Sequence, residues 1–242
     1  MAVVVPHAGW LFSGSLAYRT MRGLRAEADL VVVIGGHLHP DDAVHVAPED
    51  AIATPFGSLP VDDELRQWIQ SRLEWTTDRA VDNTVEVQLP LIAEIFGSLP
   101  IAYLRSPPSS LSGELGRSLA EFGESSGRRV AVVGSTDLTH YGSSYGFAPQ
   151  GSGEAAVQWV KDVNDARFVE ALRNVDPGEI VERATSEHSA CSSGAAAAAA
   201  AFARAQGAVE TEVVGYYTSY DVMPNPSFVG YVGLGYRSAE AV

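Results

Sequence analysis

The residues best suited to chemistry stand together in the stretch Arg129–Gly142, RVAVVGSTDLTHYG. Its first part, Val130–Gly134, predicts a buried strand because it is apolar, rich in valine and ended by glycine. The polar and ionisable side chains that follow are Ser135, Thr136, Asp137, Thr139, His140 and Tyr141. Ligands of open α/β sheets bind beyond the carboxyl ends of the strands, so this stretch indicates a candidate site.

Asp137 and His140 admit a functional and a structural interpretation. They are three positions apart, so a single helical turn would place both side chains on one face. In the structural interpretation, Ser135 or Asp137 caps a helix and His140 makes a hydrogen bond that only supports the fold. Ser135, Asp137 and His140 also have the residue types of a serine triad. Three members within one turn, without a Gly-x-Ser-x-Gly elbow, argue against that enzyme class.

Histidines also follow two other predicted strands. His7 comes directly after Ala2–Pro6, and His37 and His39 come just after Leu30–Ile34. A single histidine in this position is more often a capping or core residue than a ligand. The repeated placement after strands instead favours one shared crevice, in which several of these imidazoles converge with the side chains that follow the central strand.

The single cysteine is a further candidate for this crevice. Cys191 precedes the alanine run Ala195–Ala201, which predicts a helix whose small side chains pack closely against a sheet. A cysteine near a helix N-terminus is favoured as thiolate. Imidazole, carboxylate and thiolate together suit a first-row transition metal, and two or three protein ligands would leave positions open for catalysis. A cysteine beside a histidine would alternatively form a nucleophile and its base without any metal.

The other elements predict one α/β domain over residues 1–242, with no linker that would divide it. Strands and helices alternate, which favours a mostly parallel central sheet with helices on both faces. The predicted strands of this part are Ala2–Pro6, Leu30–Ile34, Pro100–Leu104 and Val130–Gly134, and the predicted helices are Ser13–Leu24, Val61–Leu73, Val85–Phe96 and Leu111–Phe122. Two or three helices are expected within Glu154–Arg183.

Both edges of the sheet have their own signals. The C-terminal strands Glu212–Tyr217 and Ser227–Arg237 are too close in sequence for a helical crossover, so they predict an antiparallel edge. Ala43–Ala47 predicts a short edge strand at the other side, followed by a loop at Thr54–Gly57. The alternation in this strand places His45 on the solvated face, which leaves it out of the candidate site.

Composition excludes several function classes. The chain is 46% hydrophobic and 19% charged, which is typical of a globular protein with a substantial core. Its net charge of −14 argues against nucleic acid or an anionic membrane as the main partner. No window is apolar enough for a membrane helix, no signal peptide is recognisable, and one cysteine fits a reducing, cytoplasmic compartment. CxxC, HExxH, Walker and GxGxxG patterns are all missing from the sequence.

Five blocks of the sequence occur in a recognisable order. They are Pro6-His7-Ala8-Gly9-Trp10 with Ser13-Gly14, Ile34-Gly35-Gly36-His37-Leu38-His39, Glu86-Val87-Gln88-Leu89-Pro90, Ser135-Thr136-Asp137-Leu138-Thr139-His140-Tyr141-Gly142, and Cys191. With these blocks the chain resembles the Memo family, called AmmeMemoRadiSam system protein B in prokaryotes. That family looks like a relative of the class III extradiol (LigB-type) non-haem iron dioxygenases, which implies the α/β fold predicted above.

The resemblance also implies a set of site residues. These are His7, His37, His39 and Cys191 as metal ligands, and Asp137 and His140 as catalytic residues beside the metal. The family usually has adjacent histidines in the second block, whereas Leu38 separates the two here, so either His37 or His39 is the expected ligand. The implied cofactor is iron, with copper as the alternative. The family name further implies a functional link to a radical-SAM protein.

The leading hypothesis is therefore a metal-dependent oxidoreductase of dioxygenase type, acting on a small-molecule substrate. His140 would serve as acid or base, and Asp137 would orient it or bind the metal directly. The first alternative is a non-catalytic protein that binds a peptide or small molecule on a dioxygenase-like fold. The second alternative is a cysteine hydrolase that uses Cys191 as nucleophile.

Overall fold

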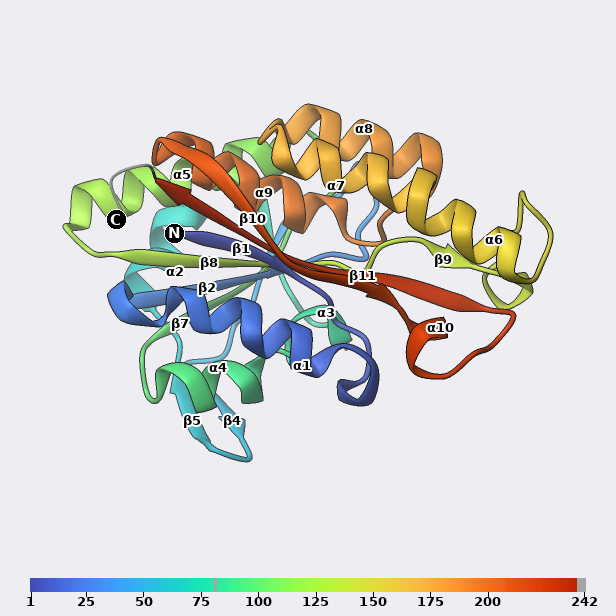
Figure 1. Cartoon of the computed structure of the whole chain (residues 1–242). Helices are drawn as coiled ribbons and strands as arrows, with labels where there is room; N and C mark the ends of the chain where they lie inside the picture. Colours follow the sequence, from blue (N-terminus) through green and yellow to red (C-terminus); the bar gives the residue numbers. More distant parts are fainter. Residues whose placement is uncertain (81, 239–242) are drawn as a thin grey trace.

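Four parallel strands form the centre of the sheet in the computed structural model, which describes residues 1–80 and 82–238 of the predicted 1–242 domain (Figure 1). In sheet order they are β1 (Ala2–Val5), β8 (Val130–Ser135), β2 (Leu30–Gly35) and β7 (Ile101–Arg105). All three neighbouring pairs are parallel, as predicted. Parallel strands place their carboxyl ends at one edge of a sheet, so the residues that follow these strands share that edge.

Antiparallel pairings extend the sheet on both sides. β11 (Phe228–Ser238) pairs with β1 and β10 (Ala208–Thr218) pairs with β11, which confirms the predicted antiparallel C-terminal edge. On the other side, β3 (Val44–Val46) runs antiparallel to β7, and β6 (Trp75–Thr77) lies outside β3. The prediction that Ala43–Ala47 is the edge strand is therefore wrong. The three residues of β6 are too few to give a periodic signal in the sequence.

Both faces of the central strands are buried, because helices cover each of them (Figure 1). Val4 and Val32 belong to one hydrophobic cluster, and Val3 and Val33 belong to the other, as expected for side chains that alternate across a strand. The helices on the first face are α2 (Asp63–Arg72), α5 (Ser110–Ser126), α7 (Asp165–Arg173), α8 (Pro177–Glu187) and α9 (Ser193–Ala205), and those on the second are α1 (Trp10–Met21) and α4 (Leu89–Phe96). Among the helices of residues 1–80 and 82–238, none is both long and apolar enough to cross a lipid bilayer.

Several helices differ from the predicted ones at their boundaries. The helix predicted over Val85–Phe96 is two helices, α3 (Asn83–Glu86) and α4, because Pro90 lies in the first turn of a new helix. Helix α1 begins at Trp10 rather than at Ser13, with Gly9 as its N-cap residue. The expected helices of Glu154–Arg183 are present as α6 (Glu154–Trp159), α7 and α8, with a π-helical turn between α6 and α7.

The loop predicted at Thr54–Gly57 is instead the turn of a β-hairpin. Its strands are β4 (Ala51–Thr54) and β5 (Gly57–Pro60), which form a small separate sheet beside α4. Gly57 has a φ of 127°, a conformation that side chains rarely adopt. This explains a glycine at the end of the turn.

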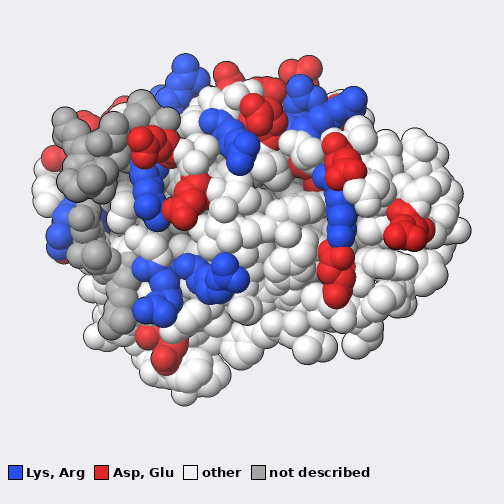
Figure 2. Space-filling view, viewed as in Figure 1, with Lys and Arg blue, Asp and Glu red and all other residues white. Residues whose placement is uncertain are grey.

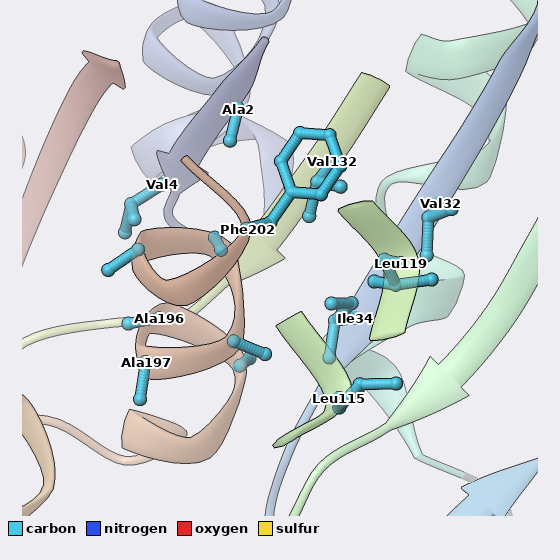
Figure 3. Close-up of a cluster of buried hydrophobic side chains, with 14 of the residues drawn as sticks. Ala2, Val4, Val32, Ile34, Leu115, Leu119, Val132, Ala196, Ala197 and Phe202 are labelled. Atoms are coloured by element: carbon cyan, nitrogen blue, oxygen red, sulfur yellow. The ribbon is translucent and has the colours of Figure 1, made fainter. Parts of the chain in front are cut away.

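The alanine run forms the buried helix α9, as predicted. Figure 3 shows Ala196, Ala197 and Phe202 of α9 against Val4 of β1 and Leu115 of α5. All the residues from Ser193 to Ala203 are buried, so helix α9 lies between the sheet and α5 and α8. Alanine suits this place because larger side chains would keep the helix away from its neighbours. Cys191 lies just before the first turn of α9.

Gly116 of α5 lies in close contact with α9, and we expect Gly116→Ala to destabilise the protein. A Cβ atom at this position would lie 2.3 Å from the carbonyl oxygen of Ala198 and 2.5 Å from the Cβ atom of Ala201. Such overpacking costs roughly 1–3 kcal/mol of unfolding free energy, which exceeds the helix-propensity gain of at most about 1 kcal/mol. Urea unfolding measures the change.

The matched control is Gly113→Ala in the same helix. There the nearest atom to a new Cβ would be the Nη1 atom of Arg117 at 3.4 Å, the far end of a flexible side chain. We expect this substitution to be neutral or stabilising by up to about 1 kcal/mol. Equal effects of the two substitutions would show that close helix packing does not constrain position 116.

Candidate metal centre

His7, His37 and Cys191 meet at the carboxyl edge of the parallel strands. His7 follows β1, His37 follows β2, and Cys191 stands directly before Ser192, the N-cap residue of α9. One ligand atom from each of the three lies within 4.8 Å of the other two. The Sγ atom of Cys191 is 3.2 Å from the Nε2 atom of His7, and the two imidazole rings are 5.3 Å apart at 86°.

A glycine allows this close approach. A Cβ atom at Gly36 would lie 2.5 Å from the Cβ atom of Ser192, so a side chain here would separate the end of β2 from the start of α9. His37 is the residue after Gly36, and Cys191 is the residue before Ser192. The glycine of the Gly35-Gly36-His37 block therefore has a steric role in assembling the site.

The ring of His7 is held by a buried polar chain. Its Nδ1 atom lies 3.2 Å from the hydroxyl of Ser135, the last residue of β8. Gln88 donates from Nε2 to that hydroxyl at 3.1 Å and to the carbonyl of Pro6 at 2.7 Å. With Nδ1 engaged in this way, the Nε2 atom of His7 is directed to Cys191.

Ser135→Ala is expected to weaken metal binding without unfolding the protein. The substitution removes the partner of His7 Nδ1, and loss of such an outer partner lowers metal affinity by roughly 10–100-fold. Titration of the purified protein with Fe(II) measures the change. Ser112→Ala is the control, because it removes another buried hydroxyl, which donates to the carbonyl of Ser109 in the first turn of α5. An unchanged affinity in Ser135→Ala would contradict the proposed role of Ser135.

His37 is held by a carboxylate in the same manner. Its Nδ1 atom lies 3.0 Å from Oδ2 of Asp82, whose other oxygen accepts a hydrogen bond from the backbone of Thr84 and so caps α3. The φ angle of His37 is +58°, a left-handed conformation that is uncommon for residues other than glycine. Both imidazoles thus have an oxygen partner on Nδ1, so Nε2 is in each ring the nitrogen that could bind a metal ion.

A buried arginine supports the His37 segment from behind. Arg105 makes two hydrogen bonds to Asp78, at 2.7 and 2.8 Å, and donates to the carbonyl of Gly36 at 3.3 Å. It also lies 3.7 Å from Asp82. His45 is in contact with this arginine, at 3.1 Å, and is only half-buried rather than on a fully solvated face as predicted. It nevertheless lies outside the group of three residues identified above.

The electrostatics favour a thiolate beside an imidazolium. Burial would raise the pKa of Cys191, but the charge of His7 and hydrogen bonds from His37 and His7 lower it well below the usual value. Burial would likewise lower the pKa of His7, but the charges of Cys191 and Asp137 raise it to about 9. The deprotonated sulfur can bind a metal ion directly, whereas His7 must release its Nε2 proton to do so.

Asp137 and His140 do not lie on one helical turn. The chain is extended after β8, and His140 belongs to the short strand β9 (His140–Tyr141), which pairs with β11. The helical turn considered for this position is not formed, so the structural interpretation in which Ser135 or Asp137 caps a helix is wrong. A buried carboxylate explains the difference, because Asp165 accepts hydrogen bonds from the backbone and the hydroxyl of Thr139 and fixes the extended segment.

The two residues nevertheless line one cavity. Asp137 is buried, accepts a hydrogen bond from the backbone of His7 at 2.7 Å, and has an oxygen 4.0 Å from His7 Nε2. His140 packs edge-on against Tyr145, with ring centres 4.9 Å apart. The cavity has a volume of about 470 Å³ and its wall includes both Asp137 and His140. It therefore reaches the metal-binding group through Asp137.

His39 is the one predicted ligand that the structure does not bring to the group. Its side chain is 73% exposed, and its Nδ1 atom lies 3.4 Å from Asp41. Its backbone amide donates to Asp42 at 2.6 Å. Of the two histidines that follow β2, His37 is thus the one that the structure places beside His7 and Cys191.

Gln88, Asp82 and Arg105 support the site but are not among the residues that the sequence predicts for it. Gln88 falls within the Glu86–Pro90 block, which was the only signal that it is special. Arg105 ends β7, where a charged residue after four apolar ones marks the same sheet edge as the histidines. Gln88 contacts Ser135, Asp82 contacts His37 and Arg105 contacts Gly36, so the three residues support the segments that carry the candidate ligands.

Comparisons with known proteins identify the family and the fold of this chain. Residues 1–235 match the family model described as Memo-like protein. The chain is 33% identical to a MEMO1 family protein of Pyrococcus abyssi over 98% of this chain and 86% of that protein. It is 30% identical to one of Methanococcoides burtonii over 97% of this chain and 85% of that protein. The crystal structure of uncharacterized protein JW3007 from Escherichia coli K12 has the same fold, with a TM-score of 0.57 and 13% identity over 97% of this chain and 99% of that one.

Proposed function

This chain belongs to the Memo-like family, and from the convergence of His7, His37 and Cys191 we propose that it binds one iron or copper ion at these residues. We further propose that it acts as an oxidoreductase of dioxygenase type on a small molecule in the adjoining cavity. The observation that supports this most strongly is that three potential metal ligands from distant parts of the chain meet at one edge of the sheet. Two of them follow strands and the third precedes a helix.

The donor set fits a redox-active transition metal. Two imidazoles and one thiolate are ligands that iron and copper accept, and three protein ligands leave further positions open. Ser135 and Asp82 hold the two Nδ1 atoms, so that neither ring needs to turn for its other nitrogen to bind. When bound, such an ion supplies electron-transfer chemistry with dioxygen, which no side chain of this site provides.

The protein's own groups would position the substrate and move its proton. The Nδ1 atom of His140 lies 3.2 Å from the carbonyl of Leu138 and donates to it, so Nε2 is the nitrogen that would accept a proton from a substrate hydroxyl. Asp137 holds the backbone of His7 and places a carboxylate between the metal ligands and the cavity. In this proposal His140 is the acid–base residue and Asp137 is a positioning residue.

Metal analysis is the direct test. We expect anaerobically purified protein to contain, or to take up from added Fe(II) or Cu(I), close to one equivalent of metal. Dioxygen consumption with candidate substrates then tests the oxidoreductase part. Protein that neither contains nor takes up either ion would overturn the proposal.

A cysteine hydrolase is the second candidate, because one observation favours it. The 3.2 Å contact between Cys191 Sγ and His7 Nε2 also matches a nucleophile and its base. Alkylation with iodoacetamide separates the two functions. If Cys191 is a metal ligand, added Fe(II) slows its alkylation. If it is a nucleophile, alkylation abolishes a hydrolytic activity that metal removal leaves intact.

A further inference from the structure

The cavity beside the metal centre has an aromatic and largely apolar wall. Phe12 of α1, Tyr145 and Tyr231 of β11 all line it, together with Met223. Tyr231 is buried, whereas Tyr145 is 47% and Met223 is 56% exposed, so the cavity has a closed floor and an open rim. Flat rings of this kind bind aromatic ligands by edge-on and stacked contacts.

The same wall lacks positive charge. Among the described residues that line the cavity there is no lysine or arginine, and Asp137 is an acid. Lys161, which reaches the short helix α10 (Ser219–Val222) beside the rim, is paired with Asp221 at 2.5 Å. In Figure 2 the surface over α10 and the first turn of α1 is almost free of blue residues. The hydroxyl and amide groups of Ser144, Ser219, Asn225 and Ser227 supply neutral hydrogen-bonding partners.

An anionic group at the rim of this cavity would lose its hydration without gaining a lysine or arginine partner among the described lining residues. Burial of a charge that is not paired is strongly unfavourable, whereas hydroxyl groups find partners among the neutral polar side chains. A ligand hydroxyl directed towards the metal centre would leave the rest of the molecule against the aromatic wall and the rim. The cavity therefore discriminates between ligands by the charge at that outer end.

We propose that this cavity takes an uncharged or cationic aromatic molecule, of the phenol or arylalkylamine type, and rejects aromatic carboxylates and phosphates. The inference rests on the proposed function, since it assigns the substrate class of the same site. It makes a separate claim, however, because the wall that selects the ligand consists of residues other than the three metal ligands.

Three phenols of matched size test the proposal on chelator-treated protein. Isothermal titration at pH 8 compares 4-ethylphenol, tyramine and 3-(4-hydroxyphenyl)propionate. We expect the neutral and cationic ligands to bind, and the carboxylate to bind at least about ten-fold more weakly, a difference of about 1.4 kcal/mol. Equal or tighter binding of the carboxylate would overturn the proposal, as would the absence of binding by all three ligands.

A charge introduced at the rim provides the reciprocal test. Met223 is exposed, so Met223→Lys is compatible with folding, and Met223→Gln is the uncharged control. We expect Met223→Lys to strengthen binding of the carboxylate and weaken binding of tyramine, whereas Met223→Gln changes neither preference. An unchanged preference in Met223→Lys would place the ligand elsewhere. Tyr145→Ala should weaken binding of all three ligands.

The outcomes separate this inference from the proposed function. Metal uptake is measured on the wild-type protein, whereas the ligand series is measured without metal. Preferential binding of the neutral and cationic phenols by a protein that takes up no metal would retain the charge rule and overturn the metal-dependent function. Metal uptake combined with preference for the carboxylate would support the metal-dependent function and overturn the proposed preference for neutral and cationic ligands.

Discussion

Alanine in place of His7 is expected to abolish metal binding. In the proposed site His7 supplies one of three protein ligands, and its Nε2 atom also lies 3.2 Å from the Sγ atom of Cys191. Loss of a ligand should lower the affinity by more than the roughly 100-fold that is the upper effect of losing an outer partner. Elemental analysis and Fe(II) titration of anaerobically purified protein measure this. Cys191→Ser should have a comparable effect, because a serine hydroxyl is a much poorer ligand for these metals.

The natural control is His39→Ala. It removes the same residue type from the same segment, but at a side chain that is 73% exposed and outside the group of three. We expect its metal content to equal that of the wild type. Full metal content in His7→Ala, or a loss in His39→Ala that matches the loss in His7→Ala, would contradict the assignment. Thermal unfolding of each variant shows whether a loss of metal reflects a loss of fold.

The largest effect on stability is expected from Arg105→Ala. Arg105 and Asp78 are nearly inaccessible to solvent, with side-chain exposures of 4% and 5%, and they form two hydrogen bonds with each other. The substitution would leave Asp78, and in part Asp82, as buried carboxylates without their cation. Breaking a buried pair in this way costs about 3–5 kcal/mol of unfolding free energy. Metal affinity should fall as well, because Arg105 also supports Gly36 and Asp82 beside His37.

An exposed pair of the same geometry provides the comparison. Arg129 also makes two side-chain hydrogen bonds to one aspartate, Asp29, but these side chains are 62% and 42% exposed. Water and salt screen such a pair, so we expect Arg129→Ala to change stability much less than Arg105→Ala. Chemical unfolding of the two variants under identical conditions compares their losses of unfolding free energy. Similar losses would mean that burial does not determine the strength of the Arg105 pair.

Hydrophobic patterning was sufficient to predict the centre of the sheet. Runs such as Val130–Gly134 and Leu30–Ile34 are buried on both faces, so their sequences are continuously apolar and their neighbours had to be parallel strands. The small edge elements were missed for the opposite reason. β6 (Trp75–Thr77) and the β4–β5 hairpin are short and mostly exposed, and such segments carry no periodic signal.

The structure brings together predicted site residues that lie at the ends of predicted elements, and it departs from the predictions where backbone geometry decides. His7, His37 and Cys191 were all expected to converge, since each lies at the end of a predicted element. The choice between His37 and His39 depends on one left-handed residue and a contact to Asp82, neither of which is visible in the sequence. The extended course of Asp137–His140 depends on Asp165, a residue from a distant helix.

The order of the strands has a consequence for how the protein is made. β1 is the first strand of the chain, yet it lies between β8 and β11, which are translated much later. At about 5–20 residues per second, a ribosome needs roughly 10–50 seconds to reach β11. Throughout this time the valines of β1 have no complete set of neighbours, and a strand of this kind is prone to aggregate or to be held by chaperones. Cys191 is also translated late, so the site assembles only near the end of synthesis, and any metal ion enters a chain that is largely complete.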